Sequence, residues 1–435
     1  MSCGRCVRLS LPKSVKSPVW AILGASSGNL VEWYDFYAYA FTAIYFAQAF
    51  FPEGDETSKL LQSAGIFGVG FLMRPLGGWF FGRMADRHGR RTSMLVSVLM
   101  MSFGSLMIAV LPTYQTIGLA APWLLLAARM IQGLSVGGEY GASATYMSEI
   151  ATPRHRGFYS SFQYMTLIGG QLLASLVIVS LDHLLEKEQI LAWGWRIPFA
   201  IGALAALVAL FLRRTLVETS TAESRRATDS GSLWGLMKQP FACLSVIGFT
   251  GGGSLIFYTY TTYMQKYLVN TAHFEKSLAN QVMTGVLLFY MLIQPVFGAL
   301  SDRVGRKRCM VGFGLWGLLT TLPLMTAIGR STGPLEAGLL IALALTGISL
   351  YTSISGIVKA ELFPIETRAL GVGFCYAIGN AIFGGSAEYT ALYLKQQGHE
   401  AYYFYYVSAM AVVFLLVALR LPDGRKDSYL SDEDV

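Results

Sequence analysis

The sequence predicts an all-α integral membrane protein of twelve transmembrane helices, arranged as two pseudo-symmetric halves of six. Hydrophobic residues make up 54% of the 435 residues and charged residues only 14%, whereas soluble domains carry roughly 25% charged residues. Apolar runs of about 20 residues, long enough to cross a bilayer, recur along the whole chain. Two short motifs also appear once in each half. Strands are not expected, because the runs lack the alternation of a membrane barrel.

Twelve apolar runs are expected to form the helices in chain order. In the first half they cover about 19–50, 60–84, 92–112, 120–149, 157–182 and 195–213. In the second half they cover about 241–270, 278–300, 308–328, 335–360, 369–394 and 401–420. The longest polar stretch lies between them and reads as a linker. The predicted units are a first half at 1–213, the linker 214–240, a second half at 241–421 and a tail at 422–435.

The charge pattern predicts the orientation in the membrane. Most of the 33 lysines and arginines lie in the two tails and in the loops that alternate along one side of the predicted bundle. Basic loops stay in the cytoplasm, so both termini are expected there. The net charge of +7 comes from scattered clusters and not from one basic face, which argues against nucleic acid as a partner.

No cofactor or metal ion is expected from the motifs. Cys3 and Cys6 form a Cys-x-x-Cys, but no second cysteine pair or histidine cluster stands near them. The glycine run 251–253 follows no strand and lacks the Lys-Ser/Thr of a phosphate loop. A small organic acid, protons and the lipid bilayer are the expected partners, and a monomer is the expected state.

The two repeated motifs indicate related halves. Residues 82–91 read Gly-Arg-Met-Ala-Asp-Arg-His-Gly-Arg-Arg, and residues 298–307 read Gly-Ala-Leu-Ser-Asp-Arg-Val-Gly-Arg-Lys. The stretch from Glu149 to Arg156 is similarly answered by the stretch from Glu361 to Arg368. Related halves with a site between them are typical of secondary transporters, because one half can rock against the other.

These loops resemble the signature of the major facilitator superfamily, over essentially the whole chain. Residues 28–36, 71–78 and 129–140 resemble its metabolite:proton symporter family, and residues 24–33, 158–171, 351–356 and 383–389 are similar to the bacterial alpha-ketoglutarate permeases within it. The resemblance implies a carrier, not an enzyme, that imports alpha-ketoglutarate with protons across a bacterial inner membrane by alternating access. Symport of citrate, shikimate or proline/betaine, and a solute sensor that moves nothing, remain alternatives.

Charged residues inside the apolar runs are the candidates for proton coupling, because each costs at least about 2.5 kcal/mol at a helix centre. Asp35 lies about halfway along the first helix, and Arg129 in the fourth is its expected partner. In the related proton-coupled sugar carriers such a pair acts as a proton switch, and the resemblance implies the same here. The alternative is a permanent ion pair. Glu32, one turn before Asp35, is the substitute, and Glu139 belongs to the same group.

Arginines are the expected ligands of a dicarboxylate, because the planar guanidinium binds a carboxylate through two parallel hydrogen bonds. Arg74 is the deepest candidate, and its alternative role is to bond carbonyls near Pro75. Arg196 is a second candidate, with a structural ion pair as its alternative. The remaining substrate candidates are Gln163, Tyr164, Gln171, Tyr258, Tyr263, Lys266 and Glu388. An interfacial position is the alternative for the lysine, whose head can snorkel to water.

The repeated loops are expected to form a gate. Their carboxylates can pair with the following arginines and cap neighbouring helix ends, so that the network breaks when the carrier opens. The gating candidates are Asp86, Arg87, Arg90, Asp302, Arg303, Arg306, Glu149 with Arg156, and Glu361 with Arg368. A basic loop that only sets the topology is the alternative, but it leaves the aspartates unexplained.

Overall fold

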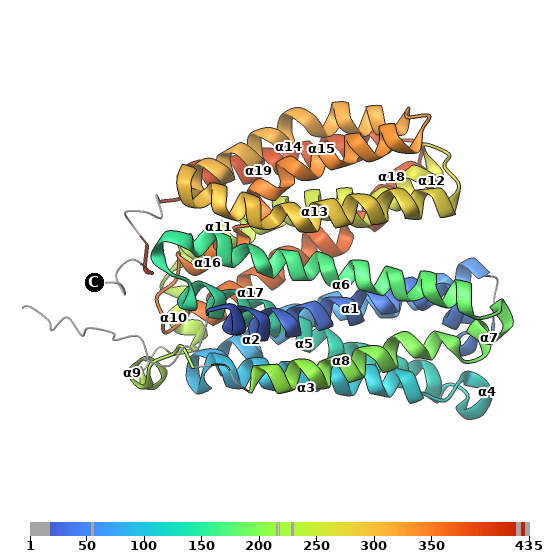
Figure 1. The fold of residues 1–435 in the computed structure, drawn as a ribbon, viewed down its shortest axis with the longest axis horizontal. Helices are drawn as coiled ribbons and strands as arrows, with labels where there is room; N and C mark the ends of the chain where they lie inside the picture. The colour runs from blue at the N-terminus through green and yellow to red at the C-terminus, as the bar shows by residue number, and fades with distance from the viewer. Residues whose placement is uncertain are drawn as a thin grey trace, which may run out of the picture.

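The described part of the chain is a bundle of long helices. The structure, a computed structural model, describes residues 18–53, 56–214, 216, 218–227, 230–422 and 428–430, and every regular element in these ranges is helical. Nine helical segments there are long and apolar enough to cross a membrane. Three further helices, α1, α2 and α5, are longer than 30 residues and run through the same bundle (Figure 1). The twelve predicted membrane helices are therefore all present.

The first half matches the predicted boundaries closely. Its membrane helices are α1 (Pro18–Phe50), α2 (Glu56–His88), α3 (Arg90–Val110), α5 (Ala120–Ile150), α6 (Arg156–Leu184) and α8 (Ile197–Arg213). Four short helices were not predicted, since so few residues show no periodicity: α4 (Tyr114–Ile117), α7 (Lys187–Ala192), α9 (Ala222–Arg226) and α10 (Leu233–Met237). The last two lie in the predicted linker. Cys3 and Cys6 fall outside the described residues.

The second half contains three membrane helices that are interrupted. The uninterrupted ones are α13 (Lys276–Val304), α14 (Arg306–Gly329) and α19 (Glu400–Arg420). The seventh consists of α11 (Pro240–Tyr258), the π-helical turn η3 (Thr259–Tyr263) and α12 (Met264–Asn270). The tenth consists of α15 (Pro334–Thr352) and α16 (Ser355–Ala360), and the eleventh of α17 (Arg368–Gly379), the π-helical turn η4 (Asn380–Gly384) and α18 (Gly385–Gln396). The sequence predicted each of these as a continuous helix.

Equivalent helices pair in the same way in the two halves, as the repeats predict. In the first half α1 packs on α6 and α8, and α3 packs on α5 and α8. In the second half α11 correspondingly packs on α17 and α19, and α14 packs on α15 and α19. The halves meet along two seams, where α2 packs on α17 and α6 packs on α13. The exact unit boundaries stay a prediction.

Glycines allow the backbones at the first seam to approach closely. A Cβ atom on Gly78 would lie 2.9 Å from the carbonyl oxygen of Gly373, and one on Gly141 would lie 2.6 Å from its Cα. Real Cβ atoms essentially never make such contacts, so α2, α5 and α17 can meet here only without side chains. Tyr376 follows this crossing by one turn of α17.

Candidate functional site

Arg74 is a buried cation without a hydrogen-bond partner. It is 1% exposed, and none of its three guanidinium-group nitrogens has a hydrogen-bond partner in the described part of the chain. The rings of Trp33, Phe36 and Phe71 lie 5.2, 4.5 and 3.9 Å from its guanidinium carbon. The alternative bonds to carbonyls near Pro75 are not formed. Since an unpaired buried charge is costly, the free donors of Arg74 point to an anionic ligand.

Lys359 is a second buried cation, and the sequence did not single it out. It lies in α16 and is 0% exposed. Its Nζ donates hydrogen bonds to the hydroxyls of Tyr140 at 2.7 Å, Tyr351 at 3.4 Å and Ser355. Helical side chains tilt toward the helix N-terminus, which directs the ammonium into the bundle although the residue stands close to the helix end.

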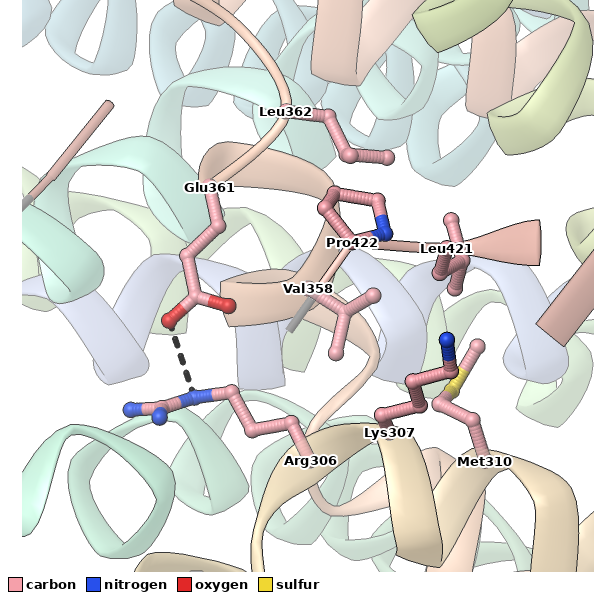
Figure 2. A pocket seen from close by; sticks show the side chains of 8 residues that line it. All are labelled: Arg306, Lys307, Met310, Val358, Glu361, Leu362, Leu421 and Pro422. Carbon is pink, nitrogen blue, oxygen red and sulfur yellow. Dashed lines mark ion pairs between the residues drawn. The ribbon is translucent and has the colours of Figure 1, made fainter. Parts of the chain in front are cut away.

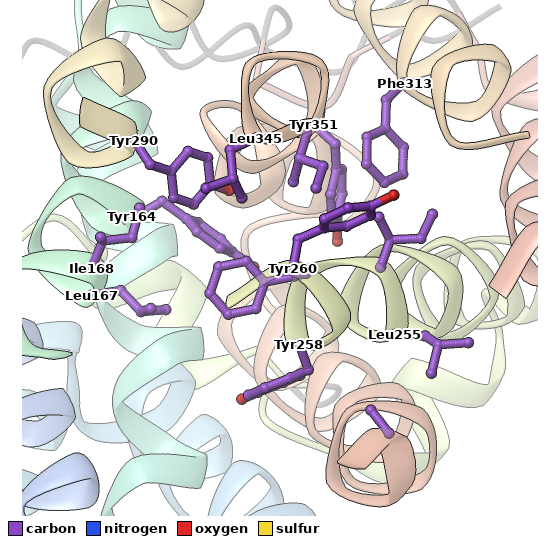
Figure 3. Packing of buried hydrophobic residues seen from close by; sticks show 14 of the residues in the cluster. Tyr164, Leu167, Ile168, Leu255, Tyr258, Tyr260, Tyr290, Phe313, Leu345 and Tyr351 are labelled. Atoms are coloured by element: carbon purple, nitrogen blue, oxygen red, sulfur yellow. The ribbon is translucent and has the colours of Figure 1, made fainter. Parts of the chain in front are cut away.

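A tyrosine cluster surrounds Lys359 at the seam between the halves. Tyr140 of α5 stacks on Tyr376 of α17 with ring centroids 3.5 Å apart and an interplanar angle of 10°. The predicted Tyr164 belongs here, since it is buried and interacts electrostatically with these two rings and with Tyr351. Figure 3 shows Tyr164 and Tyr351 projecting into the same apolar packing.

Two further predicted residues, Tyr258 and Gln163, lie beside these groups, and Gln171 is a third buried candidate. The Tyr258 ring lies 6.1 Å from Phe71, which itself covers Arg74. Gln163 donates from Nε2 to the Tyr140 carbonyl at 3.2 Å, and its Oε1 has no partner. Gln171 is buried, and its Oε1 also lacks a partner. The contacts therefore connect Arg74, Tyr164, Tyr258 and Gln163 within one buried region between the halves, while Gln171 is buried in α6.

Four other substrate candidates lie elsewhere. Arg196 donates to the carbonyls of Ala109 at 3.1 Å and Leu111 at 2.7 Å, so it caps the end of α3 and does not form the expected ion pair in the described structure. The Tyr263 hydroxyl donates to Glu400. Lys266 and Glu388 pair with each other at the surface, where their side chains are 45% and 32% exposed. These contacts favour structural roles over substrate contact.

Asp35 and Arg129 are buried without forming the predicted ion pair. Among the described residues neither carboxylate oxygen of Asp35 has a hydrogen-bond partner, and the side chain faces Gly202 of α8. Arg129 donates to Gln132 Oε1 at 2.8 Å and lies over the Tyr39 ring at 4.2 Å. Its charge nevertheless acts on Asp35. The two side chains therefore lie near each other but do not form an ion pair in this conformation.

Glu139 is held in an ion pair that the sequence analysis missed. Both of its oxygens accept from Arg213, and Ser97 donates to it at 2.9 Å. Arg213 ends α8 and looks in the sequence like one more basic loop residue, yet it is 0% exposed. Glu32 lies close to the pair and accepts from Ser135 at 2.6 Å. Glu139 therefore has a structural partner and is not a free proton acceptor here.

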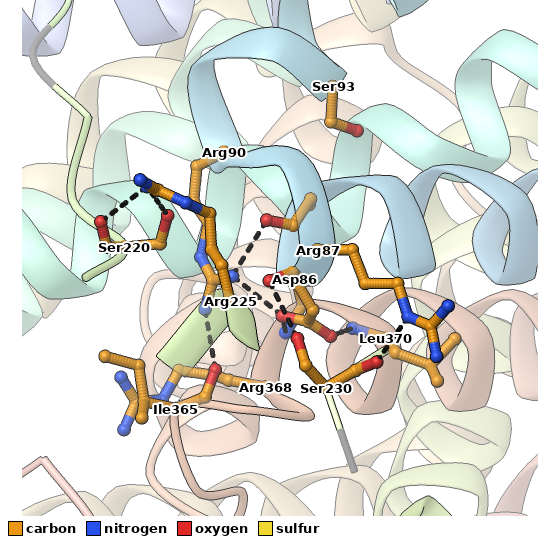
Figure 4. Close-up of polar contacts among 12 residues, drawn as sticks. Asp86, Arg87, Arg90, Ser93, Ser220, Arg225, Ser230, Ile365, Arg368 and Leu370 are labelled. Atoms are coloured by element: carbon orange, nitrogen blue, oxygen red, sulfur yellow. Dashed lines mark hydrogen bonds and ion pairs between the residues drawn. The ribbon is translucent and has the colours of Figure 1, made fainter. Parts of the chain in front are cut away.

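The loop after α2 forms a charge network with the second half. Asp86 pairs with Arg90 at 2.8 Å and accepts from the backbone of Ala369 at 3.1 Å and Leu370 at 2.9 Å, which caps α17. Arg90 also donates to the Ile365 carbonyl at 2.9 Å. Figure 4 shows these side chains meeting. We call this end of the molecule, which carries the loops after α2 and α13, the basic end.

The loop after α13 forms the counterpart network. Asp302 accepts from the backbone of Gly157 at 2.8 Å and Phe158 at 3.0 Å, which caps α6 of the first half. Arg306 lies 3.8 Å from Asp302 and 2.9 Å from Glu361. Figure 2 shows the Arg306 and Glu361 pair at the edge of a small pocket at the basic end. Each repeat therefore caps a helix of the opposite half.

The glutamates of the network have partners other than the ones expected. Glu149 pairs with Arg90 and Arg368, each at 3.2 Å, and thereby joins the two halves. Glu361 pairs with Arg306, as described above. Arg156 reaches the tail, where it donates to the Leu430 carbonyl at 3.4 Å. The predicted residues thus meet, and among the described ion pairs the one between Glu149 and Arg368 joins the two halves.

The predicted linker packs on the same network. Glu218 accepts from the backbone of Arg90 at 2.9 Å and Arg91 at 3.1 Å, which caps α3. Arg87 donates from Nε to the Ser230 carbonyl at 2.8 Å. Arg303 is exposed in the corresponding loop of the second half. The linker is therefore part of the basic end and not a free tether.

Comparison with known proteins gives consistent matches over the chain. Residues 20–226 match the family described as "Sugar (and other) transporter", and residues 242–433 match the Major Facilitator Superfamily. The chain is 60% identical to the alpha-ketoglutarate permease of Escherichia coli (strain K12), covering 93% of each chain. It is 36% identical to the citrate-proton symporter of Salmonella typhi, covering 84% of this chain and 85% of the relative.

Solved structures share the fold. The proton:xylose symporter XylE bound to 6-bromo-6-deoxy-D-glucose superposes with a TM-score of 0.81 at 17% identity, covering 96% of this chain and 98% of that one. The human organic anion transporter MFSD10 superposes with a TM-score of 0.69 at 15% identity, covering 94% and 100%. At such low identity the likeness concerns the arrangement of the helices alone.

Proposed function

The chain belongs to the major facilitator superfamily of transporters, and we propose that it carries alpha-ketoglutarate together with protons across a bacterial inner membrane. The identity of 60% to the Escherichia coli permease over nearly the whole length supports this substrate. The relative that is a citrate-proton symporter supports proton coupling to an organic acid. A superfamily member of this kind is a carrier and not an enzyme.

The observation that carries the proposal is the unpartnered guanidinium of Arg74. Its charge is buried under three aromatic rings, and no described residue offers it a hydrogen-bond acceptor. A substrate carboxylate supplies the acceptor and the countercharge through a bidentate contact. Gln163, Tyr164 and Tyr258 lie in the same region and can offer polar contacts to the rest of the substrate, and Gln171 is a further candidate. Binding thereby removes the cost of an isolated buried cation.

Proton coupling is assigned to Asp35, with Arg129 as its alternating partner. Asp35 forms no hydrogen bond at bonding distance among the described residues, although Ser105 lies near it, and a buried carboxyl group in this state needs either a proton or a cation. In the described conformation Arg129 is turned to Gln132, so the proton is the partner we assign to Asp35. Release of that proton lets Arg129 swing to the carboxylate. Glu32 is the substitute, since only one hydroxyl is bonded to it in the described structure.

Alternating access is assigned to the basic end, which we place in the cytoplasm with both termini. There Asp86 and Asp302 each cap a helix of the opposite half, so the described conformation is closed at this end. Opening toward the cytoplasm requires both caps and the Glu149 bridges to break. Once these contacts break, the substrate site faces the cytoplasm.

Uptake into proteoliposomes tests the proposed function. We expect labelled alpha-ketoglutarate to accumulate when the outside is made acidic, and unlabelled alpha-ketoglutarate to compete far better than proline or shikimate. Citrate is the decisive competitor, because a citrate carrier is among the relatives. Uptake that ignores the imposed gradient contradicts proton coupling. Stronger competition by citrate than by alpha-ketoglutarate contradicts the substrate.

A further inference from the structure

Lys359 is a buried charge that the proposed function leaves unexplained. It is 0% exposed, and its three hydrogen-bond acceptors are hydroxyl groups, which carry no charge. None of the ion pairs in the described ranges involves it; even Glu361, two residues away, pairs with Arg306 instead. Four aromatic rings lie within 4.9 to 5.6 Å of its Nζ. Unlike Arg74 it has hydrogen-bond acceptors, but like Arg74 it has no countercharge among the described residues.

The two cations come from opposite halves and share one neighbour, Tyr376. The Nζ of Lys359 lies 4.9 Å from the Tyr376 ring, and the charge of Arg74 also acts on this tyrosine. The glycine crossing brings Arg74 and Tyr376 to the same level of the bundle, because Gly78 follows Arg74 by one turn and Gly373 precedes Tyr376 by one turn. Arg74 and Lys359 therefore flank the seam from its two sides.

We propose that Lys359 binds the second carboxylate of the substrate, and that it is the residue that selects dicarboxylates over monocarboxylates. This inference rests on the proposed function, in which Arg74 binds the first carboxylate. A dianion then neutralises one cation from each half. Because the substrate has to contact both halves at once, a molecule with only one carboxylate leaves a buried ammonium without countercharge, which disfavours the closed carrier.

The test compares two ligands of equal chain length in one variant. Alpha-ketoglutarate and 2-oxopentanoate share the 2-oxo carboxylate, but the second has a methyl group in place of the distal carboxylate. Binding of both is measured on purified full-length carrier, for the wild type and for Lys359→Gln. We expect Lys359→Gln to weaken alpha-ketoglutarate about ten- to a hundred-fold, the loss of one charge-assisted contact, and to leave 2-oxopentanoate nearly unchanged.

A matched control removes the same charge elsewhere. Lys187 lies exposed at the start of α7, at the opposite end of the bundle from α16 (Figure 1), and Lys187→Gln should keep the wild-type ratio of the two affinities. A folded Lys359→Gln carrier that keeps this ratio overturns the inference. An equal loss for both ligands also overturns it, because Lys359 is then a structural residue. A wild-type carrier that does not bind alpha-ketoglutarate overturns the proposed function, and this inference with it.

A second variant keeps the test valid if Lys359→Gln fails to fold. Lys359→Arg retains the charge on a longer side chain, so the distal cation moves closer to Arg74. We expect it to shift the preference from glutarate toward the shorter succinate by about ten-fold, since the misplaced contact is again a single charge-assisted one. An unchanged chain-length preference in the folded Lys359→Arg carrier overturns the assignment.

Discussion

The charges at the basic end and those in the interior differ in one respect, which is how completely they are paired. At the basic end, Arg90 forms ion pairs with Asp86 and Glu149, and Asp86 also accepts hydrogen bonds from two backbone amides. Arg74, Asp35 and Lys359 are equally buried, yet none of them forms an ion pair in the described structure. Paired charges stabilise one conformation, whereas unpaired buried charges are retained for a ligand or a proton.

The largest effect is expected from Asp35→Asn, which replaces a titratable group by an amide of the same shape. If Asp35 carries the coupled proton, gradient-driven accumulation should be abolished, while exchange of substrate across the membrane persists in part. Accumulation and counterflow in proteoliposomes separate the two activities. Full accumulation by this variant excludes Asp35 as the coupling residue, and Glu32→Gln then becomes the next variant to measure.

Arg74→Lys tests the interior site directly and has a matched control. The ammonium keeps the charge but cannot form the bidentate contact, so affinity for alpha-ketoglutarate should fall about ten- to a hundred-fold. Arg196→Lys makes the same exchange at a residue that caps α3, and its affinity should stay near that of the wild type. The reverse result moves the carboxylate site toward Arg196, away from the region we propose.

Substitutions in the charge networks at the basic end should lower the transport rate more than the affinity for substrate. Asp86→Asn and Asp302→Asn weaken the caps that hold this end closed, which shifts the conformational balance and leaves the site intact. Asp86 should have the greater effect, because its ion pair with Arg90 is fully buried, whereas the side chains of Arg306 and Asp302 are 10% and 8% exposed. Initial rates and equilibrium binding on the same preparations decide this. Large and equal losses of affinity in both variants contradict a gating role.

The smallest effect is expected from the exposed pair of Lys266 and Glu388. Surface ion pairs contribute roughly 0–1 kcal/mol, so Lys266→Gln should change affinity and transport rate less than about three-fold. Transport assays at low and high salt measure this, since salt screens the pair further. A loss as great as that of Arg74→Lys restores Lys266 to the substrate site that the sequence suggested.

The sequence alone predicted the fold because apolar runs and repeated motifs can be recognised directly in the chain, without knowledge of which helices contact each other. Each run that is long and apolar became a helix, with ends that shifted by a few residues, as from 60 to Glu56. The π-helical turns η3 and η4 were missed, because a register change within a helix leaves the apolar pattern intact. Their presence depends on packing between helices that are distant in the sequence.

The site was predictable only where a charge interrupts an apolar run. Arg74 and Asp35 stand in the middle of their runs and were found for that reason. Lys359 and Arg213 stand near the ends of theirs, where a basic residue ordinarily indicates a loop. Whether such a side chain turns outward or back into the bundle is decided by its partners, here Ser355 and Glu139. Those partners become visible only in three dimensions.

The two π-helical turns give the two halves different stiffness. They interrupt the seventh and eleventh helices near their middle and lie close together, since a Cβ atom on Gly384 of η4 would meet the ring of Tyr258, the residue before η3. Wider turns with i→i+5 bonds are weak points at which a helix bends. The equivalent helices of the first half, α1 and α6, are continuous. The seventh and eleventh helices therefore each have a point at which they can bend, which α1 and α6 lack, and the two points lie next to each other in the second half.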